Sequence, residues 1–281
     1  MKGDMHRFNL SIIVSVYLVF IQVCIANDFE TGFFTVKDSL KESAPKTKAL
    51  LKKVTPKVIK FSGGAGAILF KDIVTGVELI ATARHLKTKN AGTIPVDDFY
   101  WTLHNPSGSD PNLAYAEYGN RSIENYISFK VKPDQFVVAL GFPTVNEMSN
   151  SIGRILPDGE VRQLQKRQGI LETDELAYNP KIERFIEARG YQGMSGGPVF
   201  NSNGEWIGTS IRAGEIRRPK PDDWKPGKVY IRFLTAAYML STFKIELEKA
   251  NGDKLKILKR FSKSVEKMNS LSSQSKCEQF Y

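Results

Sequence analysis

The stretch GYQGMSGGPVF, residues 190–200, decides how the rest of this chain is interpreted. Three glycines, Gly193, Gly196 and Gly197, surround Ser195, and a proline and a hydrophobic run follow. Glycine permits tight turns and close backbone approach, so the pattern indicates a hydroxyl displayed on a tight turn that leads into a strand. Such a display is typical of a nucleophilic serine, and a plain glycine turn between strands is the alternative.

The positions of the histidines discriminate between two enzyme architectures that display a serine in this way. The chain has three, His6, His85 and His104, and all of them precede Ser195. In α/β-hydrolases the catalytic base follows the nucleophile, so the G-x-S-x-G pattern does not indicate that fold here. The order histidine, acid, serine is that of chymotrypsin-type enzymes. His85 follows a buried-strand pattern, whereas His104 ends a predicted strand and is interpreted as structural.

Short hydrophobic runs dominate the chain from Val58 onward. They are rich in Val, Ile, Phe and Tyr, recur at about ten-residue spacing and are separated by glycine-rich or polar turns, which predicts an all-β barrel or sandwich. Examples are VIKFSGGAGAILF (58–70), GVELIATA (76–83), QFVVALGF (135–142) and GEWIGTSI (204–211). The long helices that alternate with strands in an α/β sheet are missing before residues 234–250, which we predict to be a helix.

Two motifs carry a resemblance to a known family. TARHL (82–86) resembles the T-A-A-H segment, and GMSGGPVF (193–200) resembles the G-D-S-G-G-P segment, of trypsin-like serine proteases of the chymotrypsin superfamily. The likeness is to bacterial-type members without disulfides, and it extends from Val58 to about Phe243. The resemblance implies two antiparallel six-stranded β-barrels with the active site in the cleft between them, followed by a C-terminal helix.

The predicted organisation has five parts. Residues 27–55 form an N-terminal extension, 56–133 the first barrel, 134–250 the second barrel with its helix, and 251–281 a basic tail that we expect to be poorly ordered. The chain has a net charge of +10, and the tail carries seven Lys or Arg against three acids. This charge indicates either weak contact with an anionic surface or a solvated tail that maintains solubility. No alternation of basic and aromatic residues suggests nucleic-acid binding.

Residues 1–26 have the features of a secretory signal peptide. Lys2 and Arg7 precede an uncharged run, LSIIVSVYLVFIQVCIA, that ends at Ala26. We therefore expect a secreted or periplasmic protein, and a retained membrane anchor is the alternative. Cleavage after Ala26 would leave Cys277 as the single cysteine, which excludes an internal disulfide and a cysteine-based zinc site.

The resemblance assigns roles to the motif residues. Ser195 is the expected nucleophile, His85 the expected general base and acid, and the backbone N–H groups of Gly193 and Ser195 the expected oxyanion donors. Such a reaction needs no cofactor and no metal. The predicted function is that of an exported serine endopeptidase that acts on proteins or peptides through an acyl-enzyme. A catalytically inactive trypsin-like fold that binds other proteins is the alternative.

The acid that orients the histidine is the least defined member of the site. In the family it opens a strand reading D-x-A, and the best match here, NLAYA, has Asn112 at that position. Asp110, two residues earlier, is the preferred candidate, and Asp97 and Asp98 in VDDFYW are further alternatives. An asparagine would favour the wrong histidine tautomer, and this would support the non-catalytic alternative.

Two further features concern activation and specificity. Met194 occupies a position where many animal members have an aspartate that pairs with a new N-terminus, so direct folding into the active form is expected. Arg189 and Arg212 fall where the specificity pocket of the family is formed. Two guanidinium groups there would favour an acidic side chain before the scissile bond, and the alternative is that both face solvent or pair with local acids.

Overall fold

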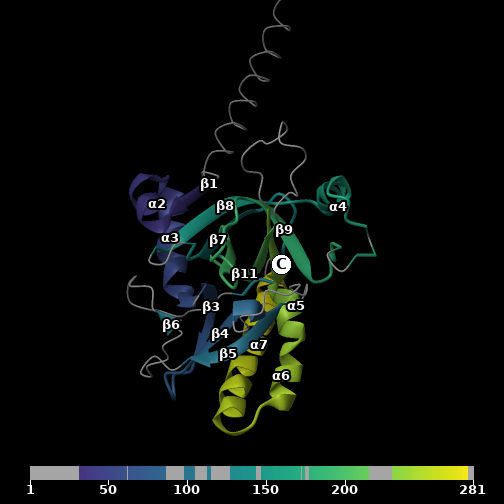
Figure 1. Cartoon of the computed structure of the whole chain (residues 1–281). Coiled ribbons are helices and arrows are strands. Elements are labelled where there is room, and N and C mark those ends of the chain that lie inside the picture. Colours follow the sequence, from purple (N-terminus) through teal and green to yellow (C-terminus); the bar gives the residue numbers. More distant parts are fainter. Residues whose placement is uncertain are drawn as a thin grey trace, which may run out of the picture.

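The computed structural model of the chain is mostly β, with helices at both ends of the sequence and one in between (Figure 1). It describes residues 32–61, 63–86, 98–104, 113–114, 127–143, 147–171, 173–174, 177–214 and 230–277. The predicted signal peptide at residues 1–26 lies outside this part of the chain. None of the helices within it combines the length and the apolar composition needed to cross a membrane.

The second half of the chain forms a closed antiparallel barrel, as the resemblance predicts. Six strands form it: β7 (Phe136–Gly141), β8 (Ser149–Ile155), β9 (Glu183–Glu187), β10 (Pro198–Asn201), β11 (Trp206–Gly214) and β12 (Tyr230–Thr235). The order is β8-β7-β10-β11-β12-β9, and β9 returns to β8 through the pairs Arg154–Glu187 and Ile155–Ile186. A further strand from the N-terminal extension, β1 (Gly32–Thr35), pairs with β8 on its outer edge.

The first half differs from the prediction. It forms a five-stranded antiparallel sheet of order β5-β4-β3-β2-β6 within the described residues, so two six-stranded barrels are not confirmed. The strands are β2 (Val58–Phe61), β3 (Gly64–Lys71), β4 (Glu78–Ala83), β5 (Phe99–His104) and β6 (Leu113–Ala114). All six residues of β4 are buried, so both of its faces are covered. Helices from the C-terminal end of the chain provide part of this cover.

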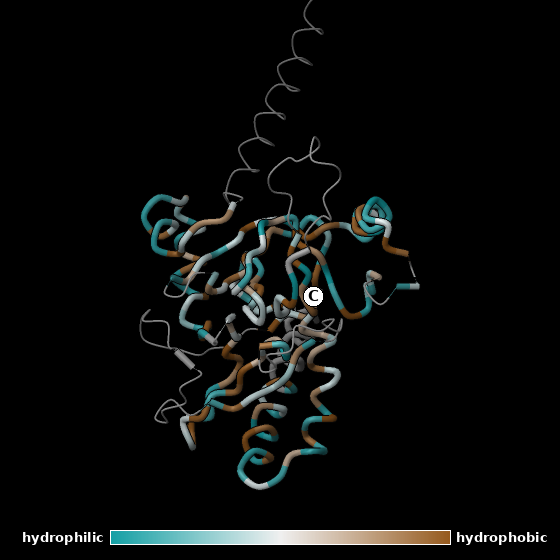
Figure 2. The backbone as a smooth tube through the Cα atoms, viewed as in Figure 1, coloured by the Kyte–Doolittle hydropathy of each residue, from teal (hydrophilic) through white to brown (hydrophobic). Residues whose placement is uncertain are grey.

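Three helices follow the barrel: α5 (Ala236–Ser241), α6 (Phe243–Lys249) and α7 (Gly252–Cys277). The first two confirm the helix predicted at 234–250, but α7 corrects the expectation of a poorly ordered tail. Its residues Leu258 and Phe261 are buried, and the Phe261 ring lies 6.2 Å from that of Trp101 in β5 and 5.0 Å from that of Phe243. Figure 2 shows hydrophobic residues along both sheets and interspersed with hydrophilic ones along α6 and α7. An amphipathic helix thus covers part of the five-stranded sheet.

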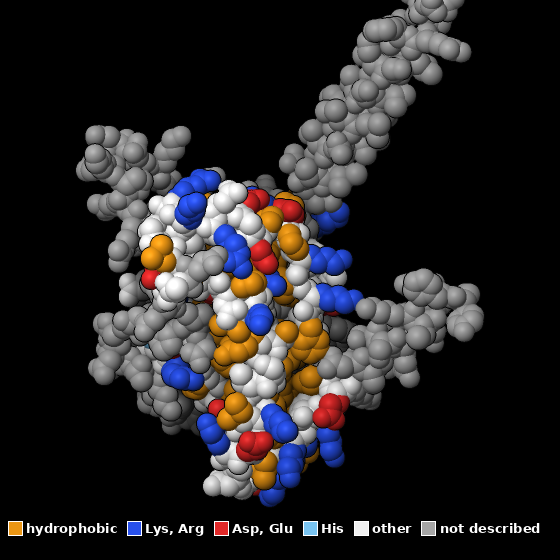
Figure 3. Space-filling model, turned by 90° about the vertical axis from the view of Figure 1, so that its right-hand side faces the viewer, with side chains coloured by type: hydrophobic (Ala, Val, Ile, Leu, Met, Phe, Trp, Pro, Cys, Tyr) orange, Lys and Arg blue, Asp and Glu red, His pale blue; other side chains and the backbone are white. Residues whose placement is uncertain are grey.

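The remaining helices lie around the barrel. The N-terminal extension contains α2 (Val36–Glu42) and α3 (Pro45–Val54), and α3 buries Leu50, Leu51 and Val54 in the core. The helix α4 (Asp158–Arg167) lies between β8 and β9. In the face drawn in Figure 3, hydrophobic side chains gather in the middle, and Lys and Arg side chains are spread around them.

Candidate active site

The loop that carries Ser195 joins β9 to β10 and can be built only with glycine at two positions. Gly193 has φ of 97° and Gly196 has φ of 79°, in the left-handed region. A Cβ atom on Gly193 would lie 2.2 Å from the carbonyl oxygen of Phe142, and one on Gly196 would lie 2.1 Å from that of Ala65. The loop therefore packs backbone against backbone on both sides of the serine.

This loop rests on the five-stranded sheet next to His85. The amide of Ala65 donates a hydrogen bond to the carbonyl oxygen of Ser195 at 2.8 Å. A Cβ atom on Gly64 would lie 2.5 Å from the same oxygen and 2.6 Å from Cδ1 of Leu86. The backbone of Ser195 and the residue that follows His85 therefore meet over Gly64. The two motifs, 110 residues apart in the sequence, share one junction between the barrel and the sheet.

His85 lies in a short 3₁₀ turn, η2 (Arg84–Leu86), directly after β4. The last residue pair of β4 and β5 is Ala83 with Phe99, and the amide of Arg84 donates to the carbonyl of Asp98 at 3.3 Å. This register places Asp98, the residue before β5, beside His85. The His85 amide donates to Oδ1 of Asp98 at 3.0 Å, and Nδ1 of the ring is in hydrogen-bond contact with Oδ2.

The contact between His85 and Asp98 determines what the imidazole can do. Asp98 is 2% exposed and the His85 side chain is 21% exposed, so the carboxylate lies beneath a ring that still reaches solvent. A carboxylate at Nδ1 favours the tautomer with hydrogen on Nδ1, which leaves the lone pair of Nε2 available as a base. No hydrogen bond joins the two described residues His85 and Ser195. Catalytic hydrogen bonds are often long before substrate binds.

Asp98 is therefore the carboxylate that the structure brings to the histidine. It was one of the alternatives in the sequence analysis, whereas the preferred Asp110 lies outside the described residues, as do Asn112 and Asp97. The signal that points to Asp98 is its position directly before the strand that pairs with the strand preceding His85. His104, the other described histidine, is 2% exposed in β5 and is paired in register with Glu78.

The backbone amides of the serine loop fall into two groups. Those of Met194, Gly196 and Gly197 donate hydrogen bonds to the carbonyls of Tyr191, Ser210 and Met194 at 3.1, 2.6 and 3.0 Å. Within the described part of the chain, the amides of Gly193 and Ser195 donate none. These two N–H groups can therefore donate to an acceptor that does not belong to the described part of the chain. The Met194 side chain, 2% exposed, packs in the barrel interior with Ile207 and Val199.

The two arginines named in the sequence analysis have different surroundings. Arg189 is exposed, and its carbonyl oxygen accepts a hydrogen bond from the hydroxyl of Ser151 at 2.6 Å. Arg212 in β11 is partly buried, and its Nε and Nη2 atoms are buried without a hydrogen-bond partner in the described part of the chain. Burial and the positive charge of Arg232 lower the pKa of Arg212, against the opposing effects of Asp98 and Glu183.

Metal-ligating residues do not cluster in this region. Among the described residues, no three His, Cys, Asp or Glu side chains are grouped so that they could hold a metal ion.

Comparison with known proteins supports the family resemblance. Residues 102–208 match the sequence model of the trypsin-like peptidase domain, a stretch that contains Ser195 and ends before Arg212. No curated protein matches the chain. The match, which includes GMSGGPVF but begins after TARHL, confirms the resemblance to trypsin-like serine proteases.

Several solved structures of the protease Rv3671c from M. tuberculosis are similar to this chain. A mutant in an inactive form is 18% identical, with a TM-score of 0.45 over 76% of this chain and 96% of the other. The inactive form without the mutation is 18% identical, with a TM-score of 0.42 over 72% and 95% of the two chains. The active form is 19% identical, with a TM-score of 0.44 over 72% and 86%.

Proposed function

We propose that this chain, which resembles trypsin-like serine proteases, is an endopeptidase that hydrolyses peptide bonds through an acyl-enzyme on Ser195. The observation that supports this most directly is the contact between His85 Nδ1 and the buried Asp98 carboxylate. A carboxylate at Nδ1 leaves Nε2 able to accept a proton, which is what a general base needs. A histidine with a purely structural role does not need this arrangement. The proposal assigns the acid role to Asp98 instead of Asp110.

The proposed reaction has two stages, acylation and deacylation. Nε2 of His85 accepts the proton of the Ser195 hydroxyl while Oγ attacks the carbonyl carbon of the scissile bond. The C–N bond then breaks, His85 gives the proton to the leaving amine, and the substrate acyl group remains on Ser195 as an ester. Water attacks the ester in the same manner, with its proton passing through His85 to Ser195. Asp98 acts as a positioning residue that stabilises the imidazolium.

The oxyanion of each tetrahedral intermediate would accept hydrogen bonds from the amides of Gly193 and Ser195. One contact fixes the peptide that carries the Ser195 amide: its carbonyl group, that of Met194, accepts a hydrogen bond from the amide of Gly197 at 3.0 Å. The next peptide after the Gly193 amide is held by the Phe142 amide, which donates to the carbonyl of Gly193 at 3.0 Å. Donors that are held in place before the charge develops need no reorganisation during the reaction. The hydrogen bonds of the serine loop support the proposal that these amides are held in place before the oxyanion forms.

We also propose that the protein is exported, on the basis of the charged start and uncharged run of residues 1–26. Amino-terminal sequencing of the protein secreted by an expressing host would test this. A mature chain that begins at Asn27 is expected, whereas retention of Met1 would contradict export by cleavage.

A fluorophosphonate probe tests the catalytic proposal because it reacts with activated serines only. We expect labelling of the wild type near pH 8, loss of labelling in Ser195→Ala and strongly reduced labelling in His85→Ala. Ser202→Ala is the matched control, since Ser202 is exposed in the turn after β10 and should label as the wild type does. A wild type that is folded and never labels would contradict catalysis and favour the protein-binding alternative.

A further inference from the structure

Two arginines face each other next to the candidate active site. Arg212 of β11 and Arg232 of β12 are paired in register, directly after a β-bulge between Ser210 and Arg212. Side chains of directly opposed residues lie on the same face of a sheet, and like charges in this arrangement are destabilising. The two positive charges therefore need carboxylates nearby. Among the described residues, Arg232 is paired with a carboxylate and Arg212 is not.

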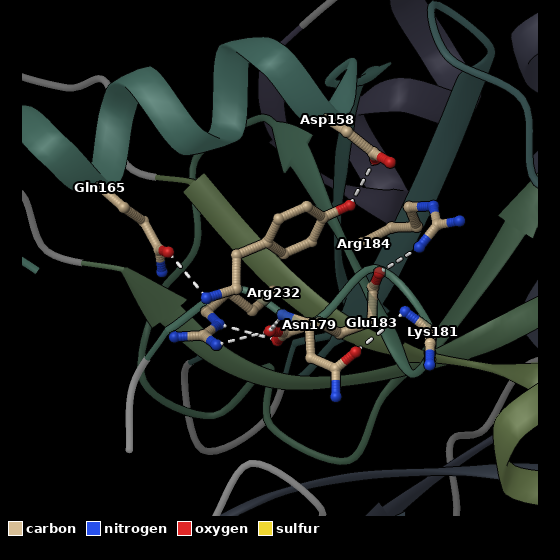
Figure 4. Close-up of polar contacts among 8 residues, drawn as sticks. Asp158, Gln165, Asn179, Lys181, Glu183, Arg184 and Arg232 are labelled. Carbon is tan, nitrogen blue, oxygen red and sulfur yellow. Dashed lines mark hydrogen bonds and ion pairs between the residues drawn. The ribbon is translucent and has the colours of Figure 1, made fainter. Parts of the chain in front are cut away.

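Arg232 has a complete set of partners. Its Nε donates to Oε2 of Glu183 at 2.9 Å and its Nη2 donates to Oε1 at 2.7 Å (Figure 4). The Arg232 side chain is 7% exposed and that of Glu183 is fully buried. The guanidinium also lies over the ring of Phe185, 5.0 Å from its centroid. This bidentate pair engages both carboxylate oxygens of Glu183.

Among the described residues, Arg212 has no such partner. Its Nε and Nη2, which form one edge of the guanidinium fork, are buried and make no hydrogen bond in the described part of the chain. The other carboxylate that acts on it is Asp98, and both oxygens of Asp98 are already in contact with His85. Within the described part of the chain, one positive charge is therefore left over in a partly buried position. An unpaired buried charge is destabilising, and proteins retain such features mainly at functional sites.

Arg212 lies on a strand that is hydrogen-bonded to the loop that carries Ser195. Ser210, two residues earlier in β11, accepts a hydrogen bond from the amide of Gly196 at 2.6 Å and donates one to the carbonyl of Gly197 at 2.8 Å. The strand that bears Arg212 is thus bonded directly to the backbone behind Ser195. On the other side, Arg212 lies within electrostatic reach of Asp98. The strand that bears Arg212 is therefore bonded to the serine half of the candidate site, and Arg212 is in electrostatic range of the acid of the histidine half.

We propose that Arg212 binds the carboxylate of an acidic substrate residue on the acyl side of the scissile bond, so that the enzyme cleaves after Glu or Asp. This inference rests on the proposed function and names the substrate class of the same site. The planar fork of a guanidinium matches a carboxylate with two parallel hydrogen bonds. A substrate with Gln leaves the charge of Arg212 unpaired, and removal of one partner of a buried charge pair lowers affinity by about 30-fold or more.

Matched peptide substrates that differ only in Glu or Gln before the scissile bond test the proposal. We expect wild-type kcat/KM, normalised to the fraction that reacts with the fluorophosphonate probe, to favour Glu by about 100-fold. In Arg212→Met this ratio should fall to about threefold or less, whereas in Arg189→Met, where the side chain is exposed, it should remain as in the wild type. A wild type without preference for Glu, or equal losses for both substrates in Arg212→Met, would overturn it.

Binding to the Ser195→Ala protein separates this proposal from the catalytic one. By calorimetry, an uncleaved peptide with a central Glu should bind more tightly than its Gln analogue, and the difference should vanish when Arg212→Met is added. A protein that never labels but shows this difference would contradict the proposed function and support the anion site; a labelling protein without the difference would do the reverse. Arg212→Met should not lower Tm, whereas Arg232→Met should, because it leaves Glu183 unpaired.

Discussion

The two halves of the candidate site are held in different ways. Ser195 belongs to a closed barrel, and its loop is fixed by backbone contacts that require glycine at 193 and 196. His85 follows β4 of the five-stranded sheet, and among the described residues its ring is held by one side chain, the Asp98 carboxylate. The nucleophile half should therefore be sensitive to added atoms. The base half should be sensitive to the loss of a single charge.

The largest effect is expected where the two halves act on one another. Ser195→Ala and His85→Ala should each lower kcat by about 10⁶-fold, and the double variant should be no worse than either single variant. The physical reason is that the hydroxyl and the imidazole perform one proton transfer together, so the loss of either removes the same step. Single-turnover rates on one peptide substrate measure this. Losses that multiply in the double variant would mean that the two residues act independently.

Asp98→Asn should have the next largest effect, a loss of about 10⁴-fold in kcat with little change in KM. An amide at this position can donate to Nδ1, which stabilises the tautomer that has hydrogen on Nε2 and no base for Ser195. Asp110→Asn is the matched comparison, because Asp110 is the acid preferred from the family pattern. A greater loss in Asp110→Asn than in Asp98→Asn would reverse the assignment of the acid.

The contrast between the halves also explains what could be predicted from the sequence. The requirements of the serine loop are local, so GMSGGP is enough to predict its turn, its proposed nucleophile and the two amides that donate no hydrogen bond within the described residues. Asp98 is 13 residues from His85, and the contact depends on how β4 and β5 pair. The register of two strands is set by tertiary packing, which a short motif does not encode. The family pattern D-x-A has its best match at Asn112, and the nearby Asp110 was therefore the preferred acid.

The cover of the first sheet was even less predictable. The Ser- and Lys-rich composition of residues 251–281 indicates a poorly ordered tail, and only a few apolar side chains of α7, among them Phe261, interrupt it. Their partners, such as Trp101 in β5, are far away in the sequence. Leu258, Phe261 and Val265 recur at the three- and four-residue spacing of an amphipathic helix, but this local signal does not identify the sheet that the helix covers.

Phe261→Ala should reveal how much the open sheet depends on this cover. The ring is 1% exposed and lies 5.7, 6.2 and 5.0 Å from the rings of Phe70, Trp101 and Phe243. Its removal should lower the free energy of unfolding by about 3–5 kcal/mol, because the cavity cannot close fully. Denaturant titration measures this, with Ile245→Ala on α6, 49% exposed, as the control. Equal small losses in both variants would mean that α7 contributes little.

In the barrel half, Gly193→Ala should lower kcat by about 100- to 1000-fold. The added Cβ would lie 2.2 Å from the carbonyl oxygen of Phe142, so the peptide must rotate and its N–H group must leave the oxyanion position. Gly76→Ala is the matched control, because Gly76 also has a positive φ, of 72°, but its Cβ would meet nothing within 4 Å. If Gly76→Ala lowers kcat as much as Gly193→Ala, general strain and not a lost donor is responsible.

The smallest effect concerns the tie between the sheet and α7. The Asp72 carboxylate, buried at the β3–β4 turn, accepts hydrogen bonds from Nε and Nη2 of Arg260 at 2.6 and 2.7 Å and from Thr75. The hydrogen bonds from Arg260, and then those from Thr75, lower the pKa of Asp72 against the opposing effect of burial. The folded-state pKa therefore lies below the unfolded value of about 4.

A lowered folded-state pKa sets the sign of the pH dependence. The stabilisation is complete above about pH 4 and is lost as the pH falls through the folded-state pKa of Asp72. In Asp72→Asn, Tm at neutral pH should be lower than in the wild type, and the difference should shrink below pH 4, where wild-type Asp72 is also neutral. Asp253→Asn is the control, because Asp253 makes a similar contact with Lys256 but is 85% exposed and should contribute little. A Tm difference between Asp72→Asn and the wild type that stays constant from pH 7 to pH 3 would mean that packing around Asp72, and not its charge, holds α7 on the sheet.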